Sequence, residues 1–336
     1  MLLIDALYIN DGGGKTMLDY LISKLEEQNI DCFYLLDDRI KNDLYQIKSS
    51  NKIIFVRASL WNRYLFYIKN KNSFKTVFCL ANIPPNIKMN CNSITYFHST
   101  LYIDLSTDNS FVDKIKIKLK RFILKKFLKN SDYWFVQTDL IKKSFNIKFN
   151  VDKNITLVKP FYPPMGKSND IFKKEAFVYL YVSIATAHKN HKRLIESFCE
   201  FYDKHDKGKL RITVGQEFVE VLKLVESKIK LGYPIENLGY IERDELLKYY
   251  QTSEYFVFPS LTESFGLGLI EAIENGCKII GADLPYTYAV CKPSIVFDPY
   301  SVESIVSAFE ATLENNIGES KSLIKDMIND VTNFIK

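Results

Sequence analysis

The stretch FPSLTESFGLGLIEAIENGCKIIGAD, from Phe258 to Asp283, contains a change from strand to helix that decides the fold. The apolar residues that end at Phe258 predict a buried strand, and those after Ser264 have helical spacing. Gly266 and Gly268 lie at the junction, where glycines let a ligand approach the backbone. Because free N–H groups and the helix dipole favour anions at a helix start, the junction predicts a phosphate site.

Two carboxylates flank this phosphate site. Glu263 precedes the helix, and Glu271 lies about two turns into it. A carboxylate accepts hydrogen bonds from paired hydroxyls, such as those of a sugar or of a ribose. A phosphate between two hydroxyl acceptors is the arrangement expected for a nucleotide sugar.

Segments rich in β-formers alternate with helical patterns along the whole chain, which predicts parallel sheets with helices on both faces. After Lys159 the stretch PFYPPMGKSND contains three prolines and a glycine and is the best linker. We therefore predict an α/β protein of two facing, doubly wound, Rossmann-like domains, whose strand ends form a cleft. The expected boundaries are 1–160 for the first domain, 161–175 for the linker, 176–318 for the second domain, and 319–336 for a C-terminal helix that packs back on the first domain.

The composition indicates well-packed cores and a basic first half. Of the 336 residues, 47% are hydrophobic, which argues against disorder. Residues 1–160 contain 25 Lys and Arg against 15 Asp and Glu, whereas residues 161–336 contain 20 against 25. The excess of positive charge in the first half indicates an anionic surface or substrate.

The six cysteines are scattered, with no CxxC pair and no cluster with histidine. This spacing argues against a zinc site or a disulfide framework and fits a reducing cytosol. The first residues show no signal-peptide pattern, and no apolar run approaches the roughly 20 residues that span a bilayer. We therefore expect a cytoplasmic protein.

The stretch INDGGGKT, from Ile9 to Thr16, looks like the end of an ATP-binding P-loop but has the wrong spacing. A P-loop places its first glycine five residues before the Gly-Lys pair, and that position is Ile9. Contiguous Gly12, Gly13 and Gly14 do not fit the dinucleotide fingerprint either. We expect a tight turn between a strand and a helix that begins near Thr16, with backbone N–H groups facing an anion. An ordinary strand-to-helix turn is the alternative.

The sequence PSLTESFGLGLIEA resembles the E-x7-E signature of retaining, GT-B-fold glycosyltransferases of family 4 (glycosyl transferases group 1). The two-domain layout of that family covers nearly the whole chain. The resemblance implies that Glu263 contacts the donor sugar and that Glu271 contacts the ribose hydroxyls. It also implies that the residues around the helix start hold the diphosphate, namely Ser264, Phe265, Gly266, Leu267 and Gly268. The segment GYIERDEL would lie against the base, through Gly239, Tyr240 and Ile241.

A second similarity to the family is SIATAHKNHKRLIESF, which begins at Ser183. Family members have a lysine just before a helix that contacts the donor phosphates, and Lys189 fits that role. A cation beside the diphosphate stabilises the charge that builds on the leaving group. The family usually also has an arginine five or six residues earlier, where this chain has Ser183 and Ile184. Lys15 or Arg193 could supply the missing charge.

His98 has two interpretations, and for Asn190 and His191 we favour an interpretation without a catalytic role. His98 ends the apolar strand of TYFHST, where similar enzymes have a histidine that touches the sugar or the acceptor, and a buried structural histidine is the alternative. We expect Asn190 to cap a helix and His191 to be solvated. The resemblance also assigns the glycine run with Lys15 to the donor phosphate or the acceptor.

Residues 113–130, DKIKIKLKRFILKKFLKN, contain eight basic residues and one acid. Apolar residues from Phe111 to Phe127 recur at helical spacing. One interpretation is an amphipathic basic helix that docks on anionic lipid at the inner face of the plasma membrane. The other is a helix that packs its apolar side on the sheet and leaves its lysines in water.

Together these patterns predict a retaining glycosyltransferase that moves a sugar from a nucleotide-diphosphate donor to a glycan or polyprenyl-linked acceptor, forming an α-linkage in O-antigen, lipopolysaccharide or capsule synthesis. The resemblance implies a front-face mechanism with no metal and no cofactor. A nucleotide-sugar epimerase of the same fold and a non-catalytic sugar-nucleotide-binding protein are the alternatives. Nucleic-acid binding is disfavoured because aromatic residues do not interleave with the basic run.

Overall fold

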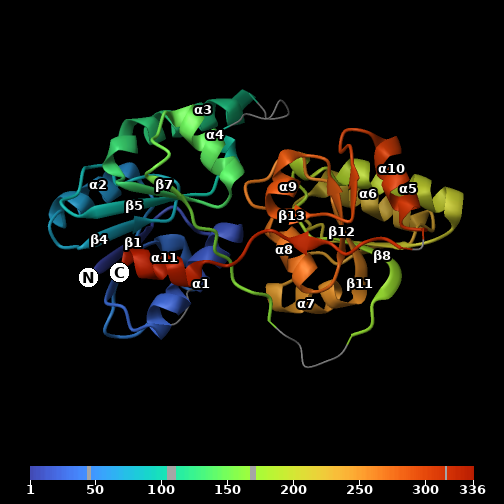
Figure 1. Cartoon of the computed structure of the whole chain (residues 1–336), viewed down its shortest axis with the longest axis horizontal. Coiled ribbons are helices and arrows are strands. Elements are labelled where there is room, and N and C mark those ends of the chain that lie inside the picture. Colours follow the sequence, from blue (N-terminus) through green and yellow to red (C-terminus); the bar gives the residue numbers. More distant parts are fainter. Residues whose placement is uncertain (44–46, 104–110, 167–171, 315) are drawn as a thin grey trace. The chain divides into compact units, whose positions relative to one another are not determined.

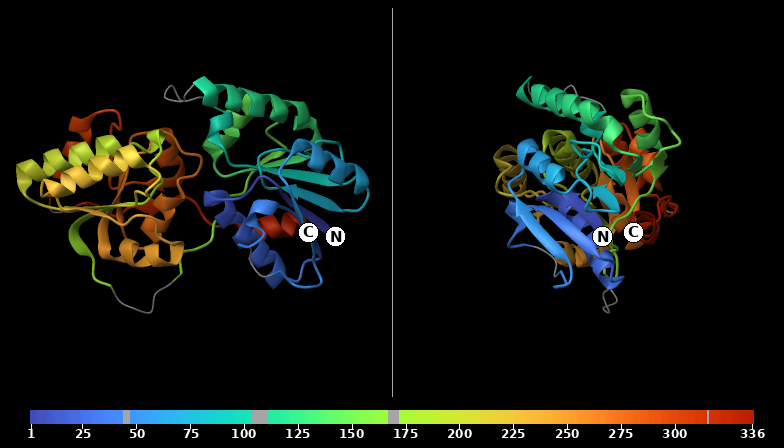
Figure 2. Two further views of the ribbon diagram at one scale, coloured as in Figure 1. Left: turned by 180° about the vertical axis from the view of Figure 1, so that it is seen from behind. Right: turned by 90° about the vertical axis from the view of Figure 1, so that its left-hand side faces the viewer.

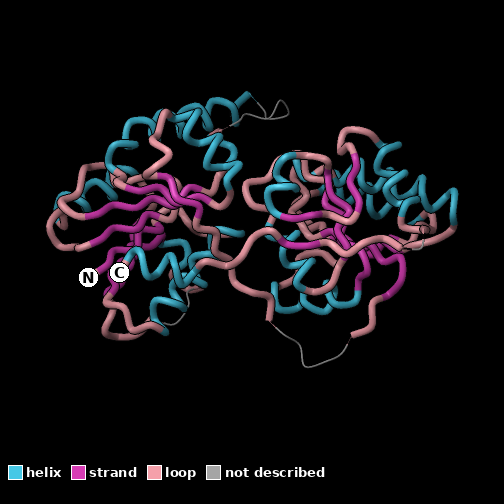
Figure 3. Tube along the Cα trace, in the orientation of Figure 1, coloured by secondary structure: helices cyan, strands magenta, loops and turns pink. Residues whose placement is uncertain are grey.

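The computed structural model describes residues 1–43, 47–103, 111–166, 172–314 and 316–336 (Figure 1). The chain divides into two compact units, and we describe each by itself. Unit 1 comprises Met1–Pro163 together with Lys325–Lys336, and unit 2 comprises Pro164–Ile324. In both units strands and helices alternate along the chain, as the sequence predicts (Figure 3).

Unit 1 contains, within its described residues, a seven-stranded parallel sheet in the order β3-β2-β1-β4-β5-β6-β7. All five residues of β1 are buried, so the sheet is covered on both faces. The strands are β1 (Leu2–Ala6), β2 (Cys32–Asp37), β3 (Lys52–Val56), β4 (Thr76–Cys79), β5 (Asn92–Phe97), β6 (Tyr133–Val136) and β7 (Thr156–Val158).

The helices of unit 1 cover both faces of this sheet. Figures 1 and 2 show α2, α3 and α4 on one face and α1 and α11 on the other, and the core clusters agree with this division. Leu2 and Ile4 pack with α1 and α11, whereas Leu3 packs with α2. The helices are α1 (Gly12–Glu27), α2 (Leu60–Lys69), α3 (Phe111–Phe127), α4 (Asp139–Phe149) and α11 (Ile328–Ile335).

Unit 2 contains a six-stranded parallel sheet among its described residues, in the order β10-β9-β8-β11-β12-β14. An aromatic layer around Tyr179 packs α5 and α10 on one face, while Phe256 meets α7 and α8 on the other. The strands are β8 (Glu175–Tyr181), β9 (Lys209–Ile212), β10 (Ile235–Asn237), β11 (Ser253–Phe258), β12 (Lys278–Ala282) and β14 (Ile295–Phe297). The helices are α5 (His191–His205), α6 (Val219–Lys230), α7 (Arg243–Thr252), α8 (Leu267–Glu274), α9 (Pro285–Val290) and α10 (Val302–Ala311).

The C-terminal segment departs from the predicted helix over 319–336, because the helix α11 begins only at Ile328. Before it, β15 (Lys321–Ser322) pairs with β13 (Cys291–Lys292), and the Ser320 hydroxyl accepts a hydrogen bond of 2.8 Å from the Ile279 N–H. These tertiary hydrogen bonds compete with helix formation, so residues 319–324 complete unit 2. The helix itself packs on α1, where the Tyr20 hydroxyl donates to Asp326 at 2.6 Å.

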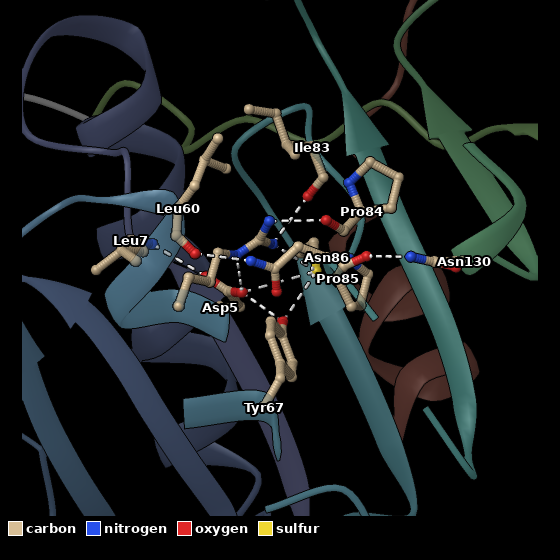
Figure 4. Close-up of polar contacts among 11 residues, drawn as sticks. Asp5, Leu7, Leu60, Tyr67, Ile83, Pro84, Pro85, Asn86 and Asn130 are labelled. Atoms are coloured by element: carbon tan, nitrogen blue, oxygen red, sulfur yellow. Dashed lines mark hydrogen bonds and ion pairs between the residues drawn. The ribbon is translucent and has the colours of Figure 1, made fainter. Parts of the chain in front are cut away.

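A buried ion pair anchors the loop that follows β4 (Figure 4). Arg63 of α2 donates from Nε to Asp5 of β1 at 2.7 Å, and both side chains are 1% exposed. The rest of the guanidinium donates to the carbonyls of Pro84 at 2.7 Å and Ile83 at 2.9 Å. The Tyr67 hydroxyl also donates to Asp5. One side chain thus ties β1, α2 and the loop after β4 together.

Arg63→Ala is expected to lower the free energy of unfolding of unit 1 by about 3–5 kcal/mol, because it leaves Asp5 as an unpaired buried charge. Both tryptophans of the chain, Trp61 and Trp134, lie in unit 1, so denaturant unfolding followed by tryptophan fluorescence reports on this unit. Exposed Arg57 provides the matched control, and Arg57→Ala should change stability by less than about 0.5 kcal/mol. Equal unfolding curves for the two variants would contradict the anchoring role.

Candidate functional site

The glycine run follows β1, Lys189 follows β8 and Glu263 follows β11, which are strands at which the strand order of each sheet reverses. In unit 1 this point lies between β1 and β4, and in unit 2 it lies between β8 and β11. Open parallel sheets bind ligands outside the carboxyl ends of the strands at such points. The fold therefore brings each set of loops to the edge of the sheet where ligands bind.

In unit 2 the start of α8 forms a turn that only glycine adopts readily. Gly266 occupies the N-cap position with φ +70°, in the left-handed region. Gly268 has a packing role, since a Cβ there would lie 3.1 Å from Cζ of Phe256 on β11. The first N–H groups of α8 lack carbonyl partners within the helix, as at every helix start, and create an anion-binding position.

Glu263 and Lys189 form an ion pair close to this helix start. Their Oε1 and Nζ atoms are 2.5 Å apart, and the two side chains are 12% and 15% exposed. The loops that carry them are joined, because the Leu261 N–H donates to the His188 carbonyl at 2.8 Å. The Tyr181 hydroxyl further donates to the Lys189 carbonyl at 2.8 Å. The carboxylate predicted for the sugar and the cation predicted for the phosphate thus lie together.

Glu271 is the second carboxylate, and it is paired with an arginine. Its side chain is buried on α8, and Oε1 accepts from Nε and Nη2 of Arg243 at 3.0 and 2.8 Å. Oε2 accepts from the Tyr250 hydroxyl at 3.1 Å. Burial raises the pKa of Glu271, and the charge and hydrogen bonds of Arg243 act in the opposite direction. Each predicted donor carboxylate therefore has its own cation in unit 2.

Unit 1 has a cavity of about 520 Å³ at its own strand-order reversal. The residues after β1, the loop after β4 and His98 at the end of β5 line it, and α2 and α3 contribute from above the sheet. Its lining residues are Tyr8, Ile9, Asn10, Asp11, Gly12, Gly13, Gly14, Leu60, Ala81, Asn82, Ile83, His98, Tyr102, Lys120 and Ile123. The glycine run and His98, which the sequence placed in one site, meet here.

His98 is held as a neutral imidazole in this cavity. Its backbone N–H donates to Oδ1 of Asn82 at 2.7 Å, and its Nε2 lies 3.0 Å from the Leu80 carbonyl. Burial lowers the pKa of His98 to about 4. At neutral pH the ring is therefore suited to a hydrogen bond with a neutral group and does not act as a fixed cation.

The profile of the family described as glycosyl transferases group 1 matches residues 167–330. This segment belongs to that family. The chain is 27% identical over 184 residues to the O-antigen chain mannosyltransferase RfbU of Salmonella typhimurium, covering 54% of this chain and 50% of that protein. It is 29% identical over 178 residues to the alpha-monoglucosyldiacylglycerol synthase of Acholeplasma laidlawii, covering 48% and 44%. The chain thus spans about half the length of these curated relatives.

Solved structures share the fold over nearly the whole chain. Anabaena HepE in complex with UDP and glucose superposes with a TM-score of 0.68 at 12% identity, covering 94% of this chain and 89% of that one. Together with the two parallel sheets, this likeness identifies the fold as the GT-B fold of glycosyltransferases, as the sequence predicted.

The loop after β8 has Ser183 and Ile184 where the family resemblance implies an arginine. The two residues suggested as substitutes, Arg193 and Lys15, already have hydrogen-bond or ion-pair partners. Arg193 donates from Nη1 to Oδ1 of Asn190 at 2.5 Å and to the Pro299 carbonyl at 3.0 Å. Lys15 belongs to unit 1, where its Nζ lies 2.6 Å from Asp19 and 3.6 Å from Asp43. Lys15 also does not line the cavity of unit 1.

The glycine run is helical, which corrects the expected turn before Thr16. The helix α1 begins at Gly12, after an extended Asp11, and the Lys15 N–H donates to the Asp11 carbonyl at 3.2 Å. A Cβ at position 14 would lie 3.2 Å from Cδ1 of Ile9, so a larger residue there would require the Ile9 side chain to shift. The run therefore presents the first turn of a helix to the cavity.

Two expectations for the start of α5 are wrong. His191, expected in solvent, is 2% exposed and packs on Tyr181 with ring centroids 4.7 Å apart. Burial lowers the pKa of His191 to about 3, so it is neutral. Asn190 is at the N-cap position but its side chain makes no capping bond; it donates to the carbonyls of Pro259 at 3.1 Å and Pro299 at 2.8 Å. The side chains of both residues therefore make tertiary contacts within unit 2.

The segment predicted to lie against the base follows β10. Gly239 has φ +67°, and its N–H donates to Oδ1 of Asn237 at 3.1 Å. The same Oδ1 accepts from the Val214 N–H at 2.9 Å, which joins this segment to the end of β9. Tyr240, the next residue, is 81% exposed.

Arg243 is the site residue that the sequence analysis missed. Its neighbours Glu242, Asp244 and Glu245 indicate only a helix start. A cation in the first turn of a helix opposes the helix dipole, and this anomaly was the available signal. Among the described residues, no group of three or more His, Cys, Asp or Glu side chains is arranged to hold a metal ion.

The contributions of Lys189 and Glu263 to the free energy of unfolding should depend on each other. We expect a double-mutant cycle with Lys189→Met and Glu263→Gln to give a coupling energy of about 1–3 kcal/mol by calorimetry. The matched control is the pair Lys192–Glu220 on the same unit, with side chains 59% and 87% exposed, which should show no measurable coupling. Additive effects of the two substitutions at 189 and 263 would show that the ion pair does not form in solution.

Proposed function

We propose that this protein is a glycosyltransferase that moves a sugar from a nucleoside-diphosphate sugar to a hydroxyl acceptor. The observation that carries the proposal is the start of α8, where an anion-binding helix N-terminus is flanked by Glu263 and Glu271, each paired with a cation. The membership of residues 167–330 in glycosyl transferases group 1 and the UDP-bound state of HepE support it.

In this proposal the ion pair Lys189–Glu263 exchanges partners when the donor binds. The diphosphate attracts Lys189 and the N–H groups at the start of α8, because it carries more negative charge than one carboxylate. Glu263 is then released to accept hydrogen bonds from the sugar hydroxyls. Lys189 stabilises the charge that develops on the leaving diphosphate, which lowers the barrier to transfer.

The cavity of unit 1 is the proposed acceptor site. Its neutral His98 and the amide of Asn82 are suited to hydroxyl groups, and its apolar lining is suited to the carbon faces of a glycan or a lipid. Retention of configuration, an α-linkage and a reaction without a metal are predictions from the family resemblance. The RfbU relative favours a glycan acceptor in surface polysaccharide synthesis.

A thermal-shift panel with UDP, GDP and their sugar conjugates tests the donor site. We expect one nucleotide series to stabilise the protein, by about 2.7 kcal/mol at a concentration 100 times its Kd. Glu263→Gln should keep binding of the free nucleoside diphosphate and lower turnover about 100-fold, because the sugar loses its positioning group.

The alternatives predict different products. Formation of an epimer from the donor alone would establish an epimerase, and donor binding without turnover on any acceptor would establish a binding protein. No stabilisation by any nucleotide would overturn the proposal.

We also propose that α3 attaches the protein to an anionic membrane. Part of the apolar surface of this helix faces away from the core: Ile115, Leu119 and Phe122 are 51%, 59% and 66% exposed, whereas Ile117 and Leu124 are buried. Exposed Lys118 and Lys120 alternate with these residues. Apolar side chains next to lysines suit the interface of an anionic lipid surface. None of the described helices has the length and hydropathy to cross a membrane.

Co-sedimentation with phosphatidylcholine vesicles, with and without phosphatidylglycerol, tests this attachment. Binding should require the anionic lipid, whose surface potential contributes about 1 kcal/mol for each nearby lysine, and it should weaken as salt screens this attraction. Leu119→Ser with Phe122→Ser should abolish binding. The control Ile147→Ser, at a residue of α4 that is 74% exposed, should leave binding unchanged. Equal binding of both variants would contradict a role for α3.

A further inference from the structure

The surroundings of the Glu271 carboxyl group determine whether it is ionised and which of its oxygens can accept a hydrogen bond from a ligand. Among the residues that the structure describes, the titratable side chains facing it include Arg243 and Tyr250 from α7 and Glu274 from α8. Burial without a partner favours the protonated acid, and a nearby carboxylate adds to that tendency. A protonated Glu271 would have one oxygen converted to a donor, so it would no longer accept hydrogen bonds at both oxygens from paired hydroxyls.

Arg243 counters this tendency and also orients the carboxylate. Its Nε and Nη2 both donate to Oε1, at 3.0 and 2.8 Å, and a carboxylate oxygen has about two lone-pair positions. Oε1 is therefore filled, and Oε2 accepts from the Tyr250 hydroxyl at 3.1 Å. The remaining lone-pair position on Oε2 is the one that a ligand hydroxyl would meet.

Arg243 makes this contact from an electrostatically unfavourable position in the fold. It is the first residue of α7, where a cation opposes the helix dipole at a cost of about 0.3–1 kcal/mol. The loop after β8, in contrast, has no cation at Ser183 or Ile184. The Ser183 N–H bonds to the Thr213 hydroxyl at 2.9 Å, and Ile184 is 60% exposed.

We propose that Arg243 is a positioning residue of the donor site, which holds Glu271 ionised and oriented for the ribose hydroxyls. This inference rests on the proposed function, since it takes the nucleotide of the donor as the ligand of Glu271. Arg243 acts through Glu271, so its removal should change how nucleotide affinity depends on pH.

The direction of the pH effect follows from the charge. Glu271 accepts ribose hydroxyls when ionised, so nucleotide binding weakens as the pH falls through its pKa. Loss of the positive charge of Arg243 raises that pKa further, which moves the weakening to higher pH. Each unit by which the pKa exceeds the assay pH weakens binding about tenfold.

Calorimetric titration of the full chain with UDP and with GDP, from acidic to alkaline pH, tests the inference. Arg243→Gln should bind at least about tenfold more weakly at neutral pH and recover at alkaline pH. Arg243→Lys, which keeps the charge, should lie between it and the wild type. Arg211→Gln is the matched control, because Arg211 pairs with Glu175 and Glu236 near β9 and is 7% exposed. Its pH profile should equal that of the wild type.

A double substitution separates positioning from direct contact. In a Glu271→Gln background, Arg243→Gln should have no further effect on the pH profile, because no titrating carboxylate remains. Loss of affinity that is equal at every pH would mean that Arg243 contacts the nucleotide itself, and would overturn the inference. A wild-type profile for Arg243→Gln would overturn it too, while leaving the proposed function intact.

Two further results of the titrations must be interpreted: a variant that does not fold, and a wild type that binds no nucleotide. If Arg243→Gln does not fold, as judged by thermal unfolding, the profile of Arg243→Lys decides: a shift to higher pH supports the inference, and an unchanged profile contradicts it. If the wild type binds neither UDP nor GDP at any pH, the proposed function fails, and the inference fails with it.

Discussion

Parallel strands put all their carboxyl ends at one edge of a sheet, and this constraint positions the candidate residues that follow β1, β8 and β11. Where the strand order reverses, the chain leaves the sheet in opposite directions and the strand ends remain open. In unit 2 the loops after β8 and β11 meet there and bring Lys189 to Glu263. In unit 1 the same geometry brings the glycine run and His98 into one cavity.

Electrostatics explain how the two carboxylates at the candidate site of unit 2 are accommodated in the fold. Glu263 and Glu271 are largely buried, and either alone would take up a proton or destabilise the fold. Lys189 and Arg243 neutralise them, and in the proposed function Lys189 also attracts the negative phosphates of the donor. In the proposed function, this arrangement suits the charges of a nucleotide sugar.

The sequence predicts the fold and much of the site, because both depend on local patterns. Alternating strands and helices, the prolines after Lys159 and the E-x7-E spacing are all visible in the sequence. What it cannot show depends on tertiary partners. His191 is buried by Tyr181, residues 321–322 pair with β13, and Arg243 reaches Glu271 from a different helix. A single sequence does not show which distant segments meet, although the cation at the start of α7 marks Arg243 as unusual.

Hydrogen–deuterium exchange with the nucleoside diphosphate that stabilises the protein most tests the central claim directly. If the donor binds at the carboxyl ends of β8 and β11, protection should appear in residues 186–191 and 263–271. The amides at the start of α8 should be protected most, since they bind the diphosphate. Protection confined to other segments, such as the β9–β10 edge of the sheet, or no protection at all would contradict the account.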